Sequence, residues 1–159
     1  GKKNGAFTTF TTAGMVILDE TYRNDTLHGK RLTYSQGARL KVVENFNKGV
    51  LEGERKSYYD DGKIQEESFY ANGNREGLTK WYMQSGIPSL EYTYKKGLLD
   101  GPAKAYDDKG LVKQEGNFMN DVEEGEWREY VGGELTKKIF YKSGTVVKET
   151  VVKKVDSSK

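Results

Sequence analysis

Apolar and polar side chains alternate along most of this chain in short runs, and each run is closed by a turn signal. In one stretch, residues 53–59 lead to an Asp-Asp-Gly sequence, and residues 63–70 return to an Asn-Gly sequence. Alternation with a period of two residues is typical of a half-buried β-strand. Asp-Gly and Asn-Gly are strong signals for hairpin turns, and their spacing leaves no room for helices. The pattern predicts short antiparallel strands joined by tight turns.

This two-strand pattern recurs with a period of 24 residues. A glycine opens every copy, a ring follows five positions later, and a second ring lies on each returning strand. The opening glycines and the first ring column, which we expect to be structural, are Gly5, Gly29, Gly53, Gly77, Gly101 and Gly125, and Phe10, Tyr34, Tyr58, Tyr82, Tyr106 and Tyr130. The second ring column is Tyr22, Phe46, Tyr70, Tyr94 and Phe118, with Tyr141 one place early. Such a period indicates a repeat protein, whose units bury their side chains against their neighbours.

We therefore predict an all-β fold, an elongated single-layer antiparallel β-meander or solenoid of about six two-stranded repeats. The repeats occupy residues 5–144 and start at residues 5, 29, 53, 77, 101 and 125. Residues 145–155 are expected to form a closing strand whose lysines protect the sheet edge. Residues 156–159 are expected to be a disordered tail.

Alternation along the strands also predicts which side chains are buried. We expect the two ring columns to share the buried face, with the opening glycines on the other face. Five further rings then project from that second face: Phe7, Phe69, Trp81, Trp127 and Phe140. Exposed rings in a polar surrounding are typical of a binding patch. The alternative is that these rings cover neighbouring glycines.

Composition and charge narrow the classes of partner. The chain has 26 Lys and Arg against 24 Asp and Glu, a net charge of +2, which gives no strong field for nucleic acid. The basic column Lys56, Lys80, Lys104 and Arg128 lies among acidic residues, so we expect ion pairs across strands. No run of about 20 apolar residues is present to span a membrane. The absence of cysteine excludes disulfides and thiolate sites.

Candidate catalytic chemistry is sparse. The single histidine, His28, stands where other repeats carry Glu or Asp, which indicates a turn residue rather than a general base. The acidic residues of the Asp-Gly turns are explained by turn chemistry, and the glycines open strands rather than phosphate-binding helices. We expect no catalytic, cofactor-binding or metal-binding residue, and a protein that is not an enzyme.

The repeat resembles a known family. Its rings and glycines are spaced as in Phe46, Gly49, Gly53 and Tyr58, a pattern similar to the MORN repeat. It is most similar to the MORN-variant repeats of bacterial proteins, including antitoxins of the YwqK type. The resemblance covers residues 5–144. It implies an antiparallel sheet used for protein contacts or, in some relatives, for lipid contacts or scaffolding, with no catalytic residue in the repeat.

These observations predict a non-enzymatic repeat scaffold that binds another protein through one sheet face. An immunity- or antitoxin-like role is what the family resemblance implies. The expected anchors and polar rim are Trp81, Trp127, Phe69 and Phe140, and Arg31 and Arg55. The alternative is a structural or membrane-peripheral protein of the cell envelope that contacts lipid or glycan; nucleic acid is not an expected partner. Because the chain begins with Gly1 rather than Met, we expect a processed or trimmed product from which any leader is already gone. For its location, we favour an extracytoplasmic one in a bacterial cell envelope.

Overall fold

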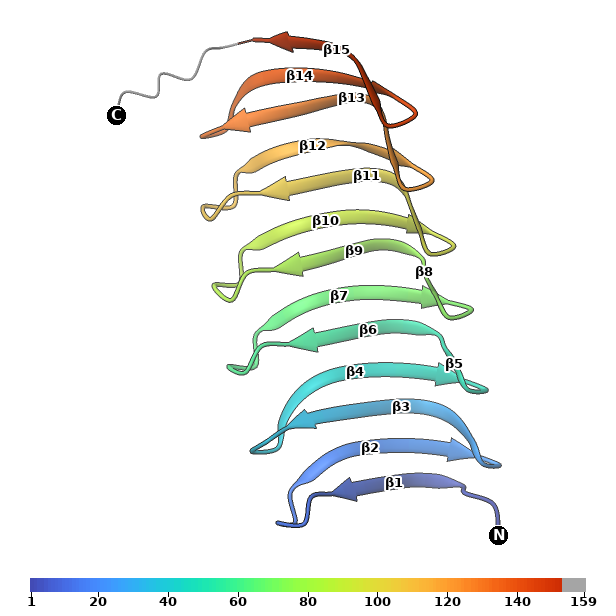
Figure 1. Cartoon of the computed structure of the whole chain (residues 1–159). Helices are drawn as coiled ribbons and strands as arrows, with labels where there is room; N and C mark the ends of the chain where they lie inside the picture. The colour runs from blue at the N-terminus through green and yellow to red at the C-terminus, as the bar shows by residue number, and fades with distance from the viewer. Residues whose placement is uncertain (153–159) are drawn as a thin grey trace. The chain divides into compact units, whose positions relative to one another are not determined.

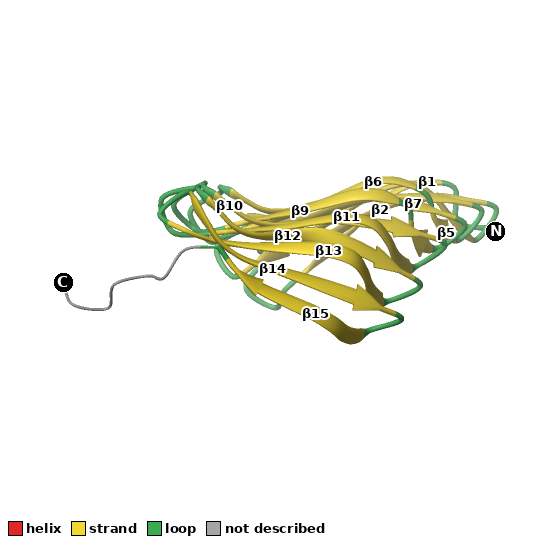
Figure 2. Cartoon of the chain, turned by 90° about the horizontal axis from the view of Figure 1, so that it is seen from above, coloured by secondary structure: helices red, strands yellow, loops and turns green. Residues whose placement is uncertain are grey.

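The computed structural model describes residues 1–152 of the chain. It contains two compact units, Gly1–Glu76 and Gly77–Lys159, and each is described by itself. The described residues of both units form strands and turns, without a helix (Figure 2). The predicted all-β antiparallel meander is therefore confirmed. The expected tail at 156–159 and the end of the closing strand at 153–155 lie outside the described residues.

Unit 1 is a single layer in which consecutive strands pair antiparallel (Figure 1). Its order is β1-β2-β3-β4-β6-β7, with the short β5 on β4 and β8 on β7. The strands are β1 (Gly5–Phe10), β2 (Val16–Arg23), β3 (Thr26–Ser35), β4 (Arg39–Asn47), β5 (Val50–Leu51), β6 (Gly53–Tyr58), β7 (Ile64–Ala71) and β8 (Asn74–Arg75).

Unit 2 follows the same plan, and its strands pair in sequence order from β9 to β15. They are β9 (Gly77–Tyr82), β10 (Pro88–Lys95), β11 (Leu98–Tyr106), β12 (Val112–Met119), β13 (Val122–Val131), β14 (Glu134–Lys142) and β15 (Thr145–Val151). All six opening glycines of the two units have positive φ, between 73° and 129°. This conformation is costly for other residue types, which explains why one residue type recurs there.

A β-bulge near the turn that follows each first-column ring decides which face a side chain occupies. In the hairpin of β6 and β7, Ser57 lies opposite Glu66 and Tyr58 lies opposite Ile64, which leaves Gln65 as an extra residue. One extra residue shifts the alternation and moves the following side chains to the opposite face. Equivalent register shifts occur in the hairpins of β1 and β2, β3 and β4, β9 and β10, β11 and β12, and β13 and β14.

Because of the bulge, the prediction that both ring columns share one face is wrong. The second ring column pairs directly with the opening glycines, as Tyr70 does with Gly53 and Phe118 with Gly101. The first ring column, such as Tyr58, alternates onto the other side. We call the face that carries the opening glycines the glycine face, and the opposite face the tyrosine face.

Burial is concentrated on the glycine face rather than on the face of the first ring column. The buried residues there include Glu44, Ser68, Thr79, Ala103, Trp127 and Ile139. The tyrosines of the first ring column are only half-buried, and Phe10 is exposed. In a single layer, a side chain is covered mainly by its neighbours on the same face, so the core consists of cross-strand contacts on the glycine face.

Turns along one edge of the sheet are held by a side chain of the preceding repeat. Glu52 accepts the backbone N–H of Asn72, and Glu124 accepts that of Ser143, both at 2.7 Å. At the corresponding place, His28 Nδ1 accepts the N–H of Lys48 at 3.4 Å. His28 therefore makes the equivalent bond, with an imidazole nitrogen that is a weaker acceptor than a carboxylate oxygen.

Replacing His28 by glutamate should strengthen this turn. Because a carboxylate makes a shorter and stronger bond to a backbone N–H, we expect His28→Glu to raise the free energy of unfolding of unit 1 by about 0.5 to 1 kcal/mol. Urea denaturation at neutral pH measures the change, with His28→Gln as the uncharged control. A loss of stability in His28→Glu would contradict the assigned bond.

Candidate functional site

The glycine face of unit 2 carries a continuous strip of rings. Trp81, Tyr92, Phe118, Trp127 and Tyr141 meet edge to face, with successive centroids 5.7, 5.9, 5.1 and 6.1 Å apart. Such contacts stabilise each ring pair beyond the area that they bury. The hydrophobic core of this unit consists of Ala103, Trp127 and Ile139, with Tyr92, Phe118 and Tyr141 of the strip packed against them.

Trp127 is held inside this core instead of projecting from it. Its side chain is 5% exposed, and its indole Nε1 donates to the carbonyl oxygen of Asn117 at 3.1 Å. The ring lies against Gly116, where any Cβ would overlap the indole. The sequence left two roles open for this ring, binding a partner or covering a neighbouring glycine. The structure shows the second, because the ring covers Gly116.

The glycine face of unit 1 carries an ion-pair ladder beside its second-column rings. Glu44 accepts from Arg31 at 2.8 Å and from Arg55 at 3.2 Å. Glu66 accepts from Arg55 at 3.4 Å and from Arg75 at 2.8 Å. The guanidinium of Arg31 also lies 4.6 Å from the centroid of Phe46, a cation–π contact. Arg31 and Arg55, expected at the rim of an interface, are thus part of an internal network.

The expected partner-binding rings are divided between the two faces, so the prediction that they share one face is wrong. Trp81 and Trp127 lie on the glycine face. Phe69 lies opposite Glu54, and Phe140 lies opposite Glu126, which places both on the tyrosine face. The physical reason is again the bulge, because it reverses the alternation of each returning strand.

The tyrosine face of unit 2 holds a row of exposed side chains that crosses the strands. Phe140 and Leu78 are each 47% exposed, and Pro102 between their strands is also exposed. The row, which we call the cross-strand stripe, consists of Leu78, Thr93, Pro102, Asn117, Glu126, Phe140 and Lys148. In unit 1, Phe69 is 45% exposed on the corresponding face.

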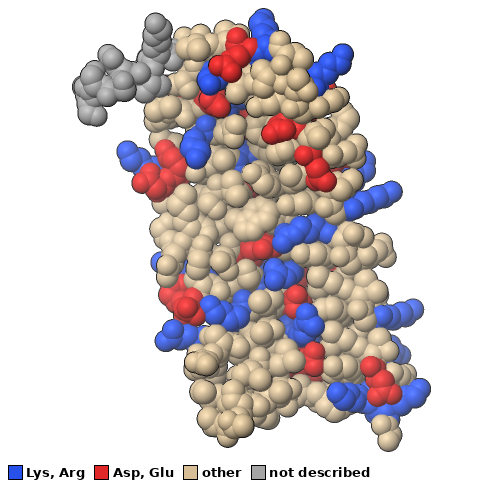
Figure 3. Space-filling model, in the orientation of Figure 1, with Lys and Arg blue, Asp and Glu red and all other residues tan. Residues whose placement is uncertain are grey.

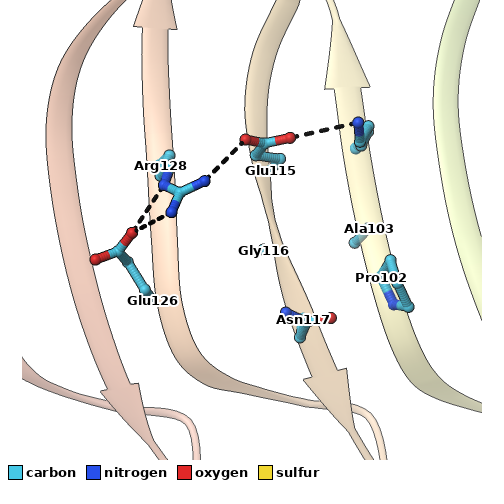
Figure 4. A pocket seen from close by; sticks show the side chains of 8 residues that line it. Pro102, Ala103, Glu115, Gly116, Asn117, Glu126 and Arg128 are labelled. Atoms are coloured by element: carbon cyan, nitrogen blue, oxygen red, sulfur yellow. Dashed lines mark hydrogen bonds and ion pairs between the residues drawn. The ribbon is translucent and has the colours of Figure 1, made fainter.

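An open depression of about 360 Å³ lies within the stripe. Its rim includes Pro102, Asn117 and Glu126, and Gly116 lies at its centre (Figure 4). Glu115 pairs with Lys104 at 3.4 Å and with Arg128 at 3.6 Å on the same rim. A second depression of about 290 Å³ shares Glu126 and is lined by Lys138, Phe140 and Lys148.

The charges of this region hold one another ionised. The hydroxyl of Tyr130 donates to Glu115 at 2.7 Å, and this bond is the main cause that lowers the pKa of Glu115. A bond from Arg128 at 2.7 Å likewise lowers the pKa of Glu126 and raises that of Arg128. Acidic and basic side chains are interspersed over the visible surface (Figure 3). Glu115, Glu126 and Arg128 are therefore charged side chains that can make polar contacts.

Burial, and then a hydrogen bond with Glu91, raises the pKa of Tyr106 from 10.0 to about 12. The folded state therefore holds this proton more tightly than the unfolded chain. Its contribution to stability is fully present below pH 10 and is lost as the pH rises toward 12. We expect stability to fall in this window and the fall to be smaller in Tyr106→Phe, as urea midpoints against pH will show. If the urea midpoint depends on pH in the same way in the wild type and in Tyr106→Phe, the contribution of the Tyr106 proton to stability is contradicted.

Over positions 1–152, no group of three or more His, Asp or Glu side chains is arranged to hold a metal ion. The same part of the chain contains no helix long and apolar enough to cross a membrane.

Of the members of the stripe, sequence reasoning found only Phe140 and missed Leu78, Thr93, Pro102, Asn117, Glu126 and Lys148. Pro102, Asn117 and Glu126 each stand one place from a residue of the repeat pattern, namely Gly101, Phe118 and Gly125. Each opening glycine pairs with a second-column ring, so the residues next to the glycine and next to the ring lie opposite each other on the tyrosine face. This pairing is the signal that could have identified the stripe.

Comparisons with known proteins agree with the repeat pattern over part of the chain. No curated protein matches the sequence significantly. Among solved structures, the chain is similar to the glycosylation-associated protein (Gap123) complex from Streptococcus agalactiae, with 15% identity and a TM-score of 0.40. That match covers 67% of this chain and 20% of the other, so it spans a fifth of that chain's length. Residues 51–72, which include β6 and β7, match the family described as MORN repeat variant.

Proposed function

We propose that the protein is a non-enzymatic repeat scaffold that binds another protein through the tyrosine face of unit 2. The observation that carries this proposal is the exposure of Leu78, Pro102 and Phe140 along one stripe. The repeat does not need apolar residues there, because other copies carry Lys30 and Glu54 at the positions of Leu78 and Pro102. Exposed apolar residues that the protein does not need for its stability are typical of an interaction surface.

The composition of the stripe also supports a protein partner. Phe140 lies beside Arg128 and Lys138, which pair with the same carboxylate, Glu126. Aromatic residues and arginine dominate the binding energy of protein interfaces. Trp127 and Arg55 are engaged within the glycine face, so they do not serve as anchors in this proposal. The resemblance to antitoxin-named repeat proteins makes a protein toxin the first partner to test.

A capture experiment with matched variants tests the proposal. Leu78→Ser/Phe140→Ser removes two exposed side chains and should leave the fold intact, while Phe10→Ser removes a comparably exposed ring elsewhere. We expect the wild type and Phe10→Ser to retain one specific protein from soluble or membrane fractions of source cells, and the double variant to lose it. Circular dichroism checks that each variant is folded.

The outcomes separate the candidate functions. If the folded double variant retains the same protein as the wild type, the proposed face is wrong. Flotation with anionic liposomes at low and moderate salt tests the membrane-peripheral alternative, because a protein held by lipid charge floats and is released by salt. Flotation that depends on Phe140, without protein capture, would replace the present proposal.

A further inference from the structure

Building on the proposed function, we propose that the partner presents an acidic, extended segment to the cations around Phe140. In this arrangement an apolar side chain of the segment packs on the Phe140 ring, and its carboxylates pair with Arg128, Lys138 and Lys148. This site lies at one end of the cross-strand stripe, on strands β13, β14 and β15.

The first observation is a pair of like charges in register. Elsewhere on this face a lysine lies opposite a glutamate, as Lys80 does opposite Glu91 and Lys104 opposite Glu115. At the next step of the ladder, Arg128 lies directly opposite Lys138. Like charges directly opposite one another destabilise a sheet. The single carboxylate of Glu126 lies 2.7 Å from Arg128 and 3.6 Å from Lys138, so it is shared by two cations.

The second observation is an unpaired cation beside the exposed ring. Lys148 lies opposite Phe140 in the β14–β15 ladder and is exposed. It makes no ion pair with any residue in the described range 1–152. Its side chain lines the same depression as Glu126, Lys138 and Phe140. The ring is therefore bordered by a cation that has no carboxylate of its own.

The local charge balance follows from these contacts. The two adjoining depressions are lined by Lys104, Arg128, Lys138 and Lys148, against Glu115 and Glu126. Four cations and two carboxylates leave an excess of two positive charges on a chain whose net charge is only +2. A short segment with a few carboxylates satisfies this excess. The exposed ring and the apolar stripe that continues to Pro102 favour a peptide over a nucleic-acid backbone.

Binding of defined peptides tests the proposal with the full chain. The probe is a fluorescein-labelled peptide in which glutamate alternates with leucine, and the controls replace glutamate by serine or by lysine. We expect only the glutamate peptide to bind by fluorescence anisotropy, with chemical shifts perturbed at Phe140 and Lys148. Lys148→Glu should weaken binding about five-fold or more, because it removes one ion pair and adds repulsion. Lys113→Glu changes an exposed lysine that lines neither depression and should have little effect.

Each other result overturns the acidic segment in a distinguishable way. If serine and glutamate peptides bind equally, and binding depends on Phe140 but not on Lys148, the charge assignment is wrong while the proposed function stands. A single-stranded oligonucleotide that competes with equal affinity would replace the acidic peptide by a general polyanion. Absence of binding, or shifts confined to the glycine face, would reject the site for this ligand, and the capture experiment would still decide the proposed function separately.

Discussion

Replacing Gly116 by alanine should destabilise unit 2 by about 3 kcal/mol, the largest effect we expect from a change of one methyl group. The added Cβ would occupy the place of the Trp127 indole, which packs on the glycine and donates to Asn117. The ring has no room to retreat without breaking its contacts with Phe118 and Tyr141. Thermal and urea denaturation, with tryptophan fluorescence as the probe, measure the loss.

A double-mutant cycle identifies the cause of that loss. Trp127→Ala alone is expected to cost about 3 kcal/mol or more, because it empties a buried ring site. If Gly116→Ala acts by overlap with the ring, it should cost far less in the Trp127→Ala background, so the two changes will not be additive. Additive losses, or a wild-type midpoint for Gly116→Ala, would show that the ring does not occupy this position.

Glu44→Gln should destabilise unit 1 by about 2 kcal/mol. Removing one partner of a buried ion pair typically costs 3–5 kcal/mol, because the remaining charge stays uncompensated. The expected loss is smaller since Arg31 and Arg55 are 33% and 21% exposed, whereas the Glu44 side chain is 11% exposed. The free energy of unfolding in urea measures it.

The matched control for this carboxylate is Asp60→Asn. Asp60 pairs with Lys41 at 2.6 Å, yet its side chain is 71% exposed, so water replaces the lost bond. We expect the urea midpoint of this variant to equal that of the wild type. Equal losses in the two variants would show that the ladder on the glycine face is no more protected than a surface pair.

The fold was predictable from the sequence because its period is regular and each hairpin has its own turn signal. Glycine columns such as Gly53 and Gly77 marked the strands, and glycine-containing sequences such as Asp61-Gly62 and Asn72-Gly73 marked the turns. The face assignment was not predictable from alternation alone. A single bulge residue such as Gln65 carries no compositional signal, yet it exchanges the faces of the residues that follow it.

The candidate site was predictable only in part for the same reason. Phe140 stood out as a ring that the repeat does not require, and the structure leaves it exposed. Trp127 stood out equally, but the glycine opposite Ala103 on β12 gives its ring a place to pack. Distinguishing these two rings requires the cross-strand neighbours, which depend on register rather than on composition.

Photo-crosslinking on each face tests most directly whether the tyrosine face is the binding surface. A photoreactive benzoylphenylalanine is placed at Phe140 on the tyrosine face or at Trp81 on the glycine face, and folded variants are irradiated with extracts of the source cells. We expect one discrete protein adduct from position 140 and none from position 81. An adduct from position 81 alone would contradict binding through the tyrosine face and assign it to the glycine face.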